Sequence, residues 1–302
     1  MDKPKQEEKV DLEEILLSVE SINLTAEILA SLKNENEFMV LAVELAKEGG
    51  SFISVVADIA PPNSTGWDRN HAILVGNLVR LAKLVSGQLD QVCQKRQETS
   101  FILSRLIFET IVNIKFFIKN ASPELFDSYV QYSMRHEKKL RDLILSEVNA
   151  RGGVELPIEK RMLYSIKELA KQSGISMDDM SSSEPKTWGG KNFYERAMDV
   201  GLDEVYLALY GGGSHSVHGN WMDLLGHHLR YEESVFIPKL TWSSPSPQIL
   251  FSTTLLSLET IREYLIYIGT SEDSNIIKRI NTLFNKVRMA DCAHETFLIS
   301  KC

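Results

Sequence analysis

Cysteine is scarce in this 302-residue chain, which contains only Cys93, Cys292 and Cys302. An odd number of widely separated cysteines argues against a disulfide scaffold and against a cysteine-based zinc site. Positive charge is in deficit too, because 33 Lys and Arg residues face 41 Asp and Glu residues and leave a net charge of −8. That balance argues against a general nucleic-acid coat, although it leaves room for a local basic cleft.

The chain also lacks a long uncharged hydrophobic run. Residues 1–14 are charged and contain no apolar core, so we expect no signal peptide there and a cytoplasmic protein. Polar residues interrupt the most apolar stretch, residues 101–118, at Arg105, Glu109, Asn113 and Lys115. Each of them is costly inside a bilayer. We therefore expect a buried helix of a soluble bundle and no membrane partner.

Helical periodicity, in contrast, is present almost everywhere, and two-residue alternation is scarce. A first amphipathic helix is expected near residues 15–28. Further helices are predicted over residues 35–47, 67–94, 99–119, 122–148, 157–173, 191–200, 247–269 and 272–288. The expected fold is all-α. It comprises a single helical bundle over residues 67–290, an N-terminal helical extension over 1–66 and a loose C-terminal tail over 291–302.

The breaks between these helices are marked by glycine, proline and serine. Gly49 and Gly50 are expected to end the second helix, and residues 51–60 form either a strand or another helical turn. Ser122 followed by proline and glutamate is a strong helix start. Residues 231–247, rich in proline and serine, predict an irregular crossover.

Three polar residues form a stripe on the apolar helix at 99–119. Arg105, Glu109 and Asn113 are spaced four residues apart, so they share one face. A helix that is apolar around the rest of its circumference is normally buried, and a charge on it must be paired or open onto a cleft. Two interpretations stay open: an Arg105–Glu109 pair inside the bundle, or a stripe that lines a pocket.

A second polar group follows three glycines at 211–213, which are expected to release the backbone and to permit either a close approach or a positive φ. His215 and His218 are three residues apart and share a face on a helical turn. They could bind a metal with Glu109 as a third ligand, or act as general acid and base. The plainer interpretation is a helix N-terminus capped by Ser214 or Ser216, with both histidines bonded to carbonyls.

A third feature lies on the helix at 122–148. Tyr129, Tyr132 and His136 can share a face, as can Arg135 with Lys138 and Lys139. A solvated amphipathic face explains this pattern, while tyrosine next to arginine also suits a phosphate or a base. Phosphate-binding loops, the dinucleotide-binding glycine pattern and the H-E-x-x-H zinc motif are all absent.

The order of several segments resembles a known family. Those segments are 69–85, 104–117, Tyr129 with Tyr132, the Trp188/Tyr194/Gly201 region, 206–210, Ser214 and the run 218–221. Together they are similar to a bacterial all-helical domain of unknown function, whose hallmarks are an Arg-x-x-x-Glu helix and a later Ser-x-x-x-His segment. The resemblance covers roughly residues 67–270.

That family is distantly similar to helical HEPN proteins, many of which are metal-independent ribonucleases of toxin or antiphage systems. The HEPN signature is an arginine followed by four to six residues and a histidine. This chain departs from that signature, because the position four residues before His218 is Ser214 and no arginine stands just upstream. The hypothesis is that Arg105 supplies the cation from the neighbouring helix.

The resemblance and the polar residues together suggest a ribonuclease that needs no metal or cofactor. The catalytic candidates are His218, His215, Glu109 and Arg105, with Arg105 holding a phosphate and Glu109 orienting a histidine. The substrate-binding candidates are Asn113, Tyr129, Tyr132, Arg135, Tyr210, Ser214, Asn220 and Trp221. RNA is the expected partner. A second copy of the chain or another protein is a further expected partner. The alternatives are a non-catalytic sensing or scaffold module with a buried polar network, and a metal-dependent hydrolase using Glu109, His215 and His218.

Overall fold

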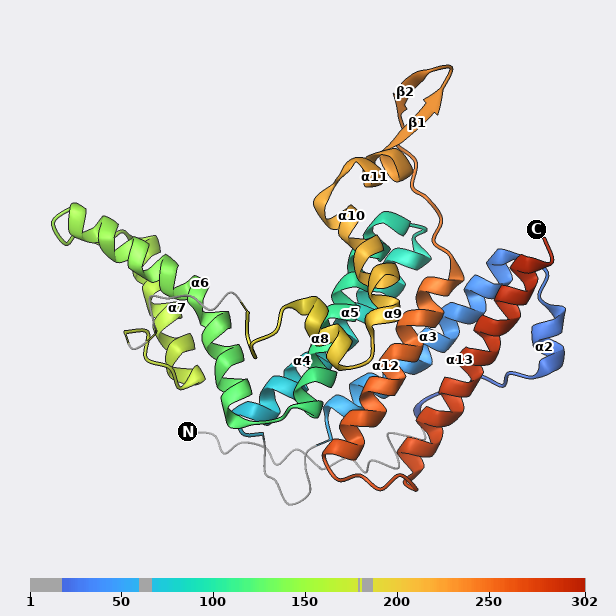
Figure 1. Ribbon diagram of the computed structural model, residues 1–302, viewed down its shortest axis with the longest axis horizontal. Helices are drawn as coiled ribbons and strands as arrows, with labels where there is room; N and C mark the ends of the chain where they lie inside the picture. Colours follow the sequence, from blue (N-terminus) through green and yellow to red (C-terminus); the bar gives the residue numbers. More distant parts are fainter. Residues whose placement is uncertain (1–17, 60–66, 179, 181–186, 302) are drawn as a thin grey trace.

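The computed structural model describes residues 18–59, 67–178, 180 and 187–301, and it confirms the predicted all-α fold. Figure 1 shows a bundle of long helices with two projections. The long helices are α3 (Glu35–Ala57), α4 (Arg69–Cys93), α5 (Gln97–Lys119), α6 (Pro123–Ala150), α7 (Pro157–Ser173), α12 (Pro247–Tyr267) and α13 (Asn275–Ile299). The short ones are α2 (Ala26–Ser31), α8 (Phe193–Asp199), α9 (Asp203–Val205), α10 (Gly212–His218) and α11 (Trp221–Asp223). Two π-helical turns, η1 (Tyr206–Gly211) and η2 (Leu224–His228), and a hairpin of β1 (Leu229–Glu232) and β2 (Val235–Pro238) complete the described elements.

The core of the bundle lies between α3, α4, α5, α12 and α13 (Figure 1). Helix α4 packs against α3 and α5, and α12 packs against α3, α5 and α13. Large side chains such as Phe52, Phe108 and Tyr264 are fully buried there, and their burial is the main favourable term for folding. By length and composition α4 could also cross a membrane, a test that the core helix of a soluble bundle passes too.

Helix α3 runs straight through the two glycines that were expected to end it. It continues from Glu35 to Ala57, so residues 51–57 are helical. A Cβ atom on Gly49 would lie 3.0 Å from the side chain of Thr254 on α12. The glycine therefore allows α3 and α12 to approach closely, and this packing outweighs its poor helix propensity.

The two ends of the chain also differ from expectation. The first predicted helix lies partly outside the described residues. Within them Ser18 is helical, residues 19–25 are not, and α2 begins only at Ala26, so the prediction of one continuous helix to residue 28 was wrong. The last helix, expected to end near residue 288, continues to Ile299, so 291–299 are not a loose tail. Ala290 and His294 are fully buried, and the His294 ring packs 5.0 Å from the ring of Phe38 on α3. This packing stabilises the last turns of α13. The proposed domain boundaries stay a prediction.

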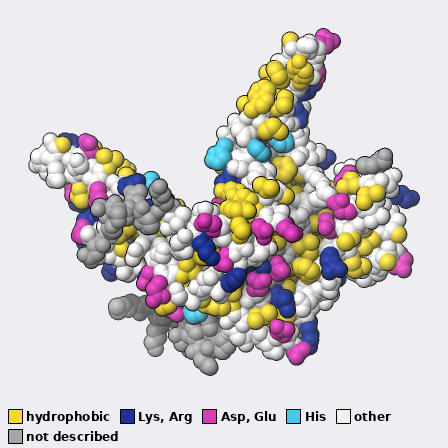
Figure 2. Space-filling view, viewed as in Figure 1, with side chains coloured by type: hydrophobic (Ala, Val, Ile, Leu, Met, Phe, Trp, Pro, Cys, Tyr) yellow, Lys and Arg dark blue, Asp and Glu magenta, His cyan; other side chains and the backbone are white. Residues whose placement is uncertain are grey.

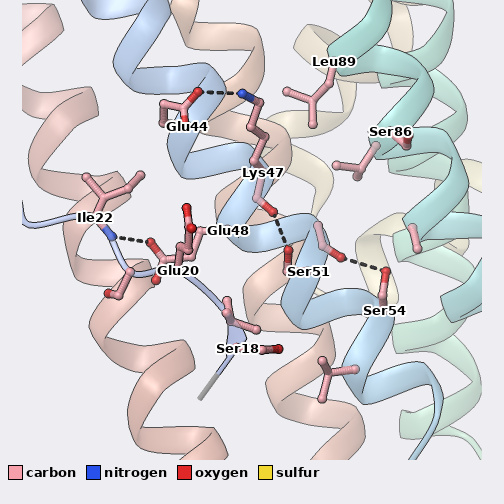
Figure 3. Close-up of a pocket in the computed structure, with 16 residues that line it drawn as sticks. Ser18, Glu20, Ile22, Glu44, Lys47, Glu48, Ser51, Ser54, Ser86 and Leu89 are labelled. Atoms are coloured by element: carbon pink, nitrogen blue, oxygen red, sulfur yellow. Dashed lines mark hydrogen bonds and ion pairs between the residues drawn. The ribbon is translucent and has the colours of Figure 1, made fainter. Parts of the chain in front are cut away.

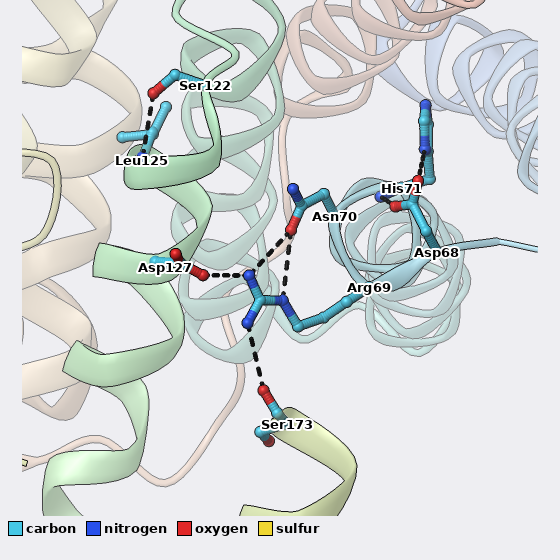
Figure 4. Close-up of polar contacts among 8 residues, drawn as sticks. All are labelled: Asp68, Arg69, Asn70, His71, Ser122, Leu125, Asp127 and Ser173. Carbon is cyan, nitrogen blue, oxygen red and sulfur yellow. Dashed lines mark hydrogen bonds and ion pairs between the residues drawn. The ribbon is translucent and has the colours of Figure 1, made fainter. Parts of the chain in front are cut away.

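Helices α6 and α7 form an arm that projects from the bundle (Figure 1). Ser122 caps α6, with Pro123 at its first position, as predicted. The arm has a small core of its own, made by Val130, Met134, Ile166, Ala170 and Met177. At its base, Arg69 of α4 donates to Asp127 of α6 and to the Ser173 carbonyl of α7 (Figure 4).

The second projection is the hairpin, which occupies part of the predicted irregular crossover. Tyr231 pairs with Phe236 across the strands, and Trp221 of α11 contacts Phe236 with 5.3 Å between ring centroids. These three aromatic residues are exposed. In Figure 2 hydrophobic side chains gather along this projection, with histidines at its base.

Candidate functional site

The candidate site is built around Arg105, which is only 9% exposed on α5. Its Nε donates to Glu109 Oε1 at 3.1 Å, one turn further along the helix. Its two terminal nitrogens donate to Ser214 Oγ at 3.1 Å and to Tyr210 OH at 3.0 Å. The predicted stripe therefore meets the predicted polar segment, although more than one hundred residues separate them in the sequence.

The close approach between α5 and α10 depends on Gly213. A Cβ atom there would lie 2.7 Å from Arg105 Cβ and 2.8 Å from the carbonyl oxygen of Phe101. Gly213 therefore has the close-approach role predicted for the glycine run. The backbone stays helical there, so the predicted release of the backbone was wrong. Ser214 lies inside α10, whose first position follows Gly211, so the capping role suggested for Ser214 or Ser216 was wrong too.

Aromatic rings line the site beside Arg105. The Arg105 guanidinium lies 4.3 Å from the centroid of the Tyr210 ring, which stacks on Tyr206 at 4.8 Å and contacts Phe193 at 4.6 Å. Burial raises the pKa of Tyr206, and Arg105 partly opposes that shift. Tyr206 and Tyr210 both belong to the π-helical turn η1, a rare conformation that is frequent at functional sites.

A second buried guanidinium belongs to Arg196 of α8, which was not predicted as a site residue from the sequence. It is 7% exposed, lies over the Trp188 ring at 4.2 Å and donates to the Lys191 carbonyl at 2.8 Å. Its Nε is buried and has no hydrogen-bond partner among the described residues. Burial lowers its pKa, while the nearby Tyr132 and Glu109 groups raise it. The only cue in the sequence is an arginine on a short helix between aromatic residues.

Of the other residues predicted to bind substrate, Asn113 and Tyr132 have polar features that suit a binding site, whereas Tyr129 belongs mainly to the core. Asn113 has a buried Oδ1 without a hydrogen-bond partner in the described structure. Tyr132 contributes to the electrostatics of Arg196 and lies under the guanidinium of Arg135, 3.6 Å from the ring centroid. Tyr129, in contrast, packs edge-on against Phe117 and Trp188 and is mainly part of the core.

The two histidines lie at the rim of the site. His215 and His218 are exposed on α10, and His215 Nδ1 is 2.7 Å from the side-chain nitrogen of Asn220. Glu109 pairs with Arg105 through Oε1, and the proposal that it orients a histidine stays a prediction. His218 follows Ser214 by one helical turn and therefore lies on the same side of α10.

Metal binding by Glu109, His215 and His218 is contradicted by the geometry. Within residues 18–59, 67–178, 180 and 187–301, no group of three or more His, Cys, Asp or Glu side chains is arranged to hold a metal ion. The described site instead has two arginines, one carboxylate, tyrosines and a serine, which suit an anionic ligand.

A family model described as a family of unknown function (DUF5677) matches residues 71–235, which include every residue of the site. The chain belongs to the DUF5677 family. This confirms the resemblance to an all-helical domain of unknown function. The matched DUF5677 segment ends within the hairpin, whereas α12 and α13 lie beyond it. No curated protein and no solved structure matches the chain.

Proposed function

We propose that the site around Arg105 binds a phosphodiester of RNA and cleaves it without a metal. Two guanidinium groups, of Arg105 and Arg196, and the carboxylate of Glu109 leave one positive charge in a half-buried site. A phosphodiester has one negative charge and oxygen acceptors that match guanidinium donors. The observation that supports this function best is the buried Arg105, which unites α5 with Ser214 and Tyr210.

In the proposed reaction, the ribose 2′-hydroxyl attacks the adjacent phosphorus atom. His218 accepts the hydroxyl proton, and the bond between phosphorus and the 5′-oxygen breaks. His215 donates a proton to that leaving oxygen, so a 2′,3′-cyclic phosphate and a 5′-hydroxyl form. Arg105 stabilises the charge that develops on the phosphate oxygens. Exposed Trp221, together with Tyr132, Arg135 and Asn220, supplies surfaces for neighbouring bases and phosphates.

A second candidate function is that of a non-catalytic sensing or scaffold module, in which the same residues form a buried structural network. It is favoured by the fact that all three guanidinium nitrogens of Arg105 already have protein partners. A fully satisfied buried network of this kind can serve to fix a single packing arrangement.

One experiment separates the two candidates. Total RNA is incubated with purified protein in excess chelator, comparing wild type with His218→Ala and with His136→Ala, an exposed histidine on α6. Loss of an acid–base group slows cleavage by about 100-fold or more, so His218→Ala should be inactive while His136→Ala matches wild type. No cleavage by folded wild type, with a Glu109→Ala variant whose melting temperature falls by many degrees, would instead support the scaffold.

The biological setting follows from the ribonuclease proposal. HEPN-like ribonucleases belong to toxin and antiphage systems, and we propose a bacterial, cytoplasmic role of that kind. The net charge of −8 makes tight nonspecific RNA binding unfavourable. The proposed enzyme is therefore selective or depends on a partner, either a second copy of the chain or another protein.

A further inference from the structure

A separate cavity lies on the other side of α4, between α3, α4 and the segment 18–22 (Figure 3). Its volume is about 930 Å³, within the size range of sites for small organic ligands. None of the residues proposed for RNA cleavage lines it. Its walls combine apolar side chains, such as Val55, Val85 and Leu89, with hydroxyl and carboxylate groups.

The decisive group in this cavity is the carboxylate of Glu48. Glu48 is only 6% exposed, yet it lines the cavity. One of its oxygens accepts the backbone N–H of Ile22 at 3.2 Å. Within the described part of the chain no cation pairs with it. A buried carboxylate without a counterion is costly, and a ligand that supplies positive charge would remove that cost.

The cations around the cavity already have other partners. Lys47 pairs with Glu44 at 2.6 Å (Figure 3). On α13, Lys286 donates to Ser21 Oγ at 2.8 Å, and Arg279 donates to the Val19 carbonyl at 3.0 Å. None of these three cations forms an ion pair with Glu48 among the described residues, since Lys47 pairs with Glu44 and the other two donate to neutral oxygens.

The serines of the cavity present acceptors. Ser51 Oγ donates to the Lys47 carbonyl at 3.1 Å, and Ser54 Oγ donates to the Gly50 carbonyl at 3.0 Å (Figure 3). Because each hydroxyl has a single proton, both oxygens keep lone pairs for a donor. A matching ligand is rich in N–H donors.

We propose that this cavity binds a linear aliphatic polyamine. One ammonium group pairs with Glu48. An ammonium group only donates hydrogen bonds, so it matches a wall that offers mainly acceptors. Methylene groups lie along Val55, Val85 and Leu89, and a second ammonium group reaches the exposed carboxylate of Glu20 at the cavity edge. The site is independent of the proposed RNA cleavage.

The test is isothermal titration calorimetry, in which spermidine is titrated into the 302-residue chain at low ionic strength. Wild type should show one saturable site. Glu48→Gln keeps the shape of the side chain but removes its charge, and it should weaken binding by about tenfold or more, as expected for a desolvated charge pair. Glu147→Gln removes the same charge from the exposed face of α6, and its affinity should stay within about twofold of wild type.

A second variant tests the cavity in case the Glu48→Gln protein does not fold. Ser86 is exposed and lines the cavity from α4, so Ser86→Leu obstructs it without disturbing the core. This variant should also lose spermidine binding while melting at the wild-type temperature. Equal affinities for wild type, Glu48→Gln and Ser86→Leu would overturn the proposal, because binding would then reflect only the overall negative charge. Absence of saturable binding to wild type would overturn it as well.

Discussion

The candidate site contains two of the buried polar atoms that lack a hydrogen-bond partner among the described residues. Arg105 is satisfied by three side chains, but Arg196 Nε and Asn113 Oδ1 are buried without partners among the described residues. Each such group costs about 1–3 kcal/mol. Sites that wait for a ligand commonly tolerate this cost. In the proposed complex, a phosphate oxygen accepts from Arg196 and a hydroxyl donates to Asn113.

A single buried residue, Tyr264, makes the free energy of unfolding depend on pH in the alkaline range. Burial raises its pKa from 10.0 to about 12. The unfolded chain ionises first, so the stability due to this neutral phenol is present below pH 10 and is lost as the pH rises through 12. Two pKa units correspond to about 2–3 kcal/mol. We expect the free energy of unfolding, measured in urea at a series of pH values, to fall by about this amount across that range.

The matched variants for that measurement are Tyr264→Phe and Tyr231→Phe. Tyr264→Phe removes the buried phenol, so its stability should change less with alkaline pH than that of wild type. Tyr231 is 61% exposed in the hairpin, and its replacement should leave the wild-type pH dependence unchanged. Parallel curves for wild type and Tyr264→Phe would contradict the assignment.

Elements defined by capping chemistry could be predicted from the sequence, whereas those defined by tertiary packing could not. The start of α6 at Ser122-Pro123 and the end of α7 at Gly174, with a left-handed φ of 68°, both follow from local signals. Gly49 was misinterpreted as a helix end because it serves close contact between α3 and α12, and a single sequence does not reveal that contact. For Gly213 a close approach was among the predicted roles, but the sequence could not show that α5 is its partner. The hairpin was missed because Glu233 and Ser234 adopt φ values of 48° and 67° at its turn without the usual Asn-Gly signal.

The packing role of Gly213 leads to a prediction at the scale of α10. Gly213→Ala places a methyl group against Arg105 Cβ and the Phe101 carbonyl oxygen, so α10 must shift away from α5. We expect a loss of about 1–3 kcal/mol in the free energy of unfolding. Gly212→Ala is the control, because nothing lies within 4 Å of a Cβ atom there. It should be neutral or stabilising by up to about 1 kcal/mol. Equal effects of the two changes, measured by urea unfolding, would show that Gly213 has no packing role.

For the whole molecule, the sequence predicted which residues meet but not the full site. The polar spacing identified Arg105 and Glu109, and the later segment supplied Ser214 and Tyr210, which the fold joins. Arg196 reaches the same place only through the path of α8 back to α5, which no local pattern encodes. The histidines, expected inside the pocket, lie at its exposed rim because α10 ends at His218 and its last turn is open to solvent.

The attachment of the α6–α7 arm is a property of the whole chain, since Arg69 links three helices that are distant in sequence (Figure 4). The Arg69 and Asp127 side chains are 37% and 49% exposed, so screening by water keeps their pairing weak. Arg69→Ala should therefore leave global stability within about 1 kcal/mol of wild type. Because the Ser173 carbonyl loses its donor, amide exchange in the last turn of α7 should accelerate by up to about tenfold.

Hydrogen exchange followed by mass spectrometry tests this attachment directly. Arg161→Ala is the matched control, because it removes the same charge from an exposed position on α7. If Arg69 holds the arm, only Arg69→Ala speeds exchange near Ser173, while exchange in α12 and α13 stays as in wild type. The small core of Val130, Met134 and Ile166 should stay protected in both variants, because it belongs to the arm itself. Unchanged exchange at Ser173 in Arg69→Ala would mean that the aromatic packing of Trp188 on Phe117 and Tyr129 is enough to fix the arm.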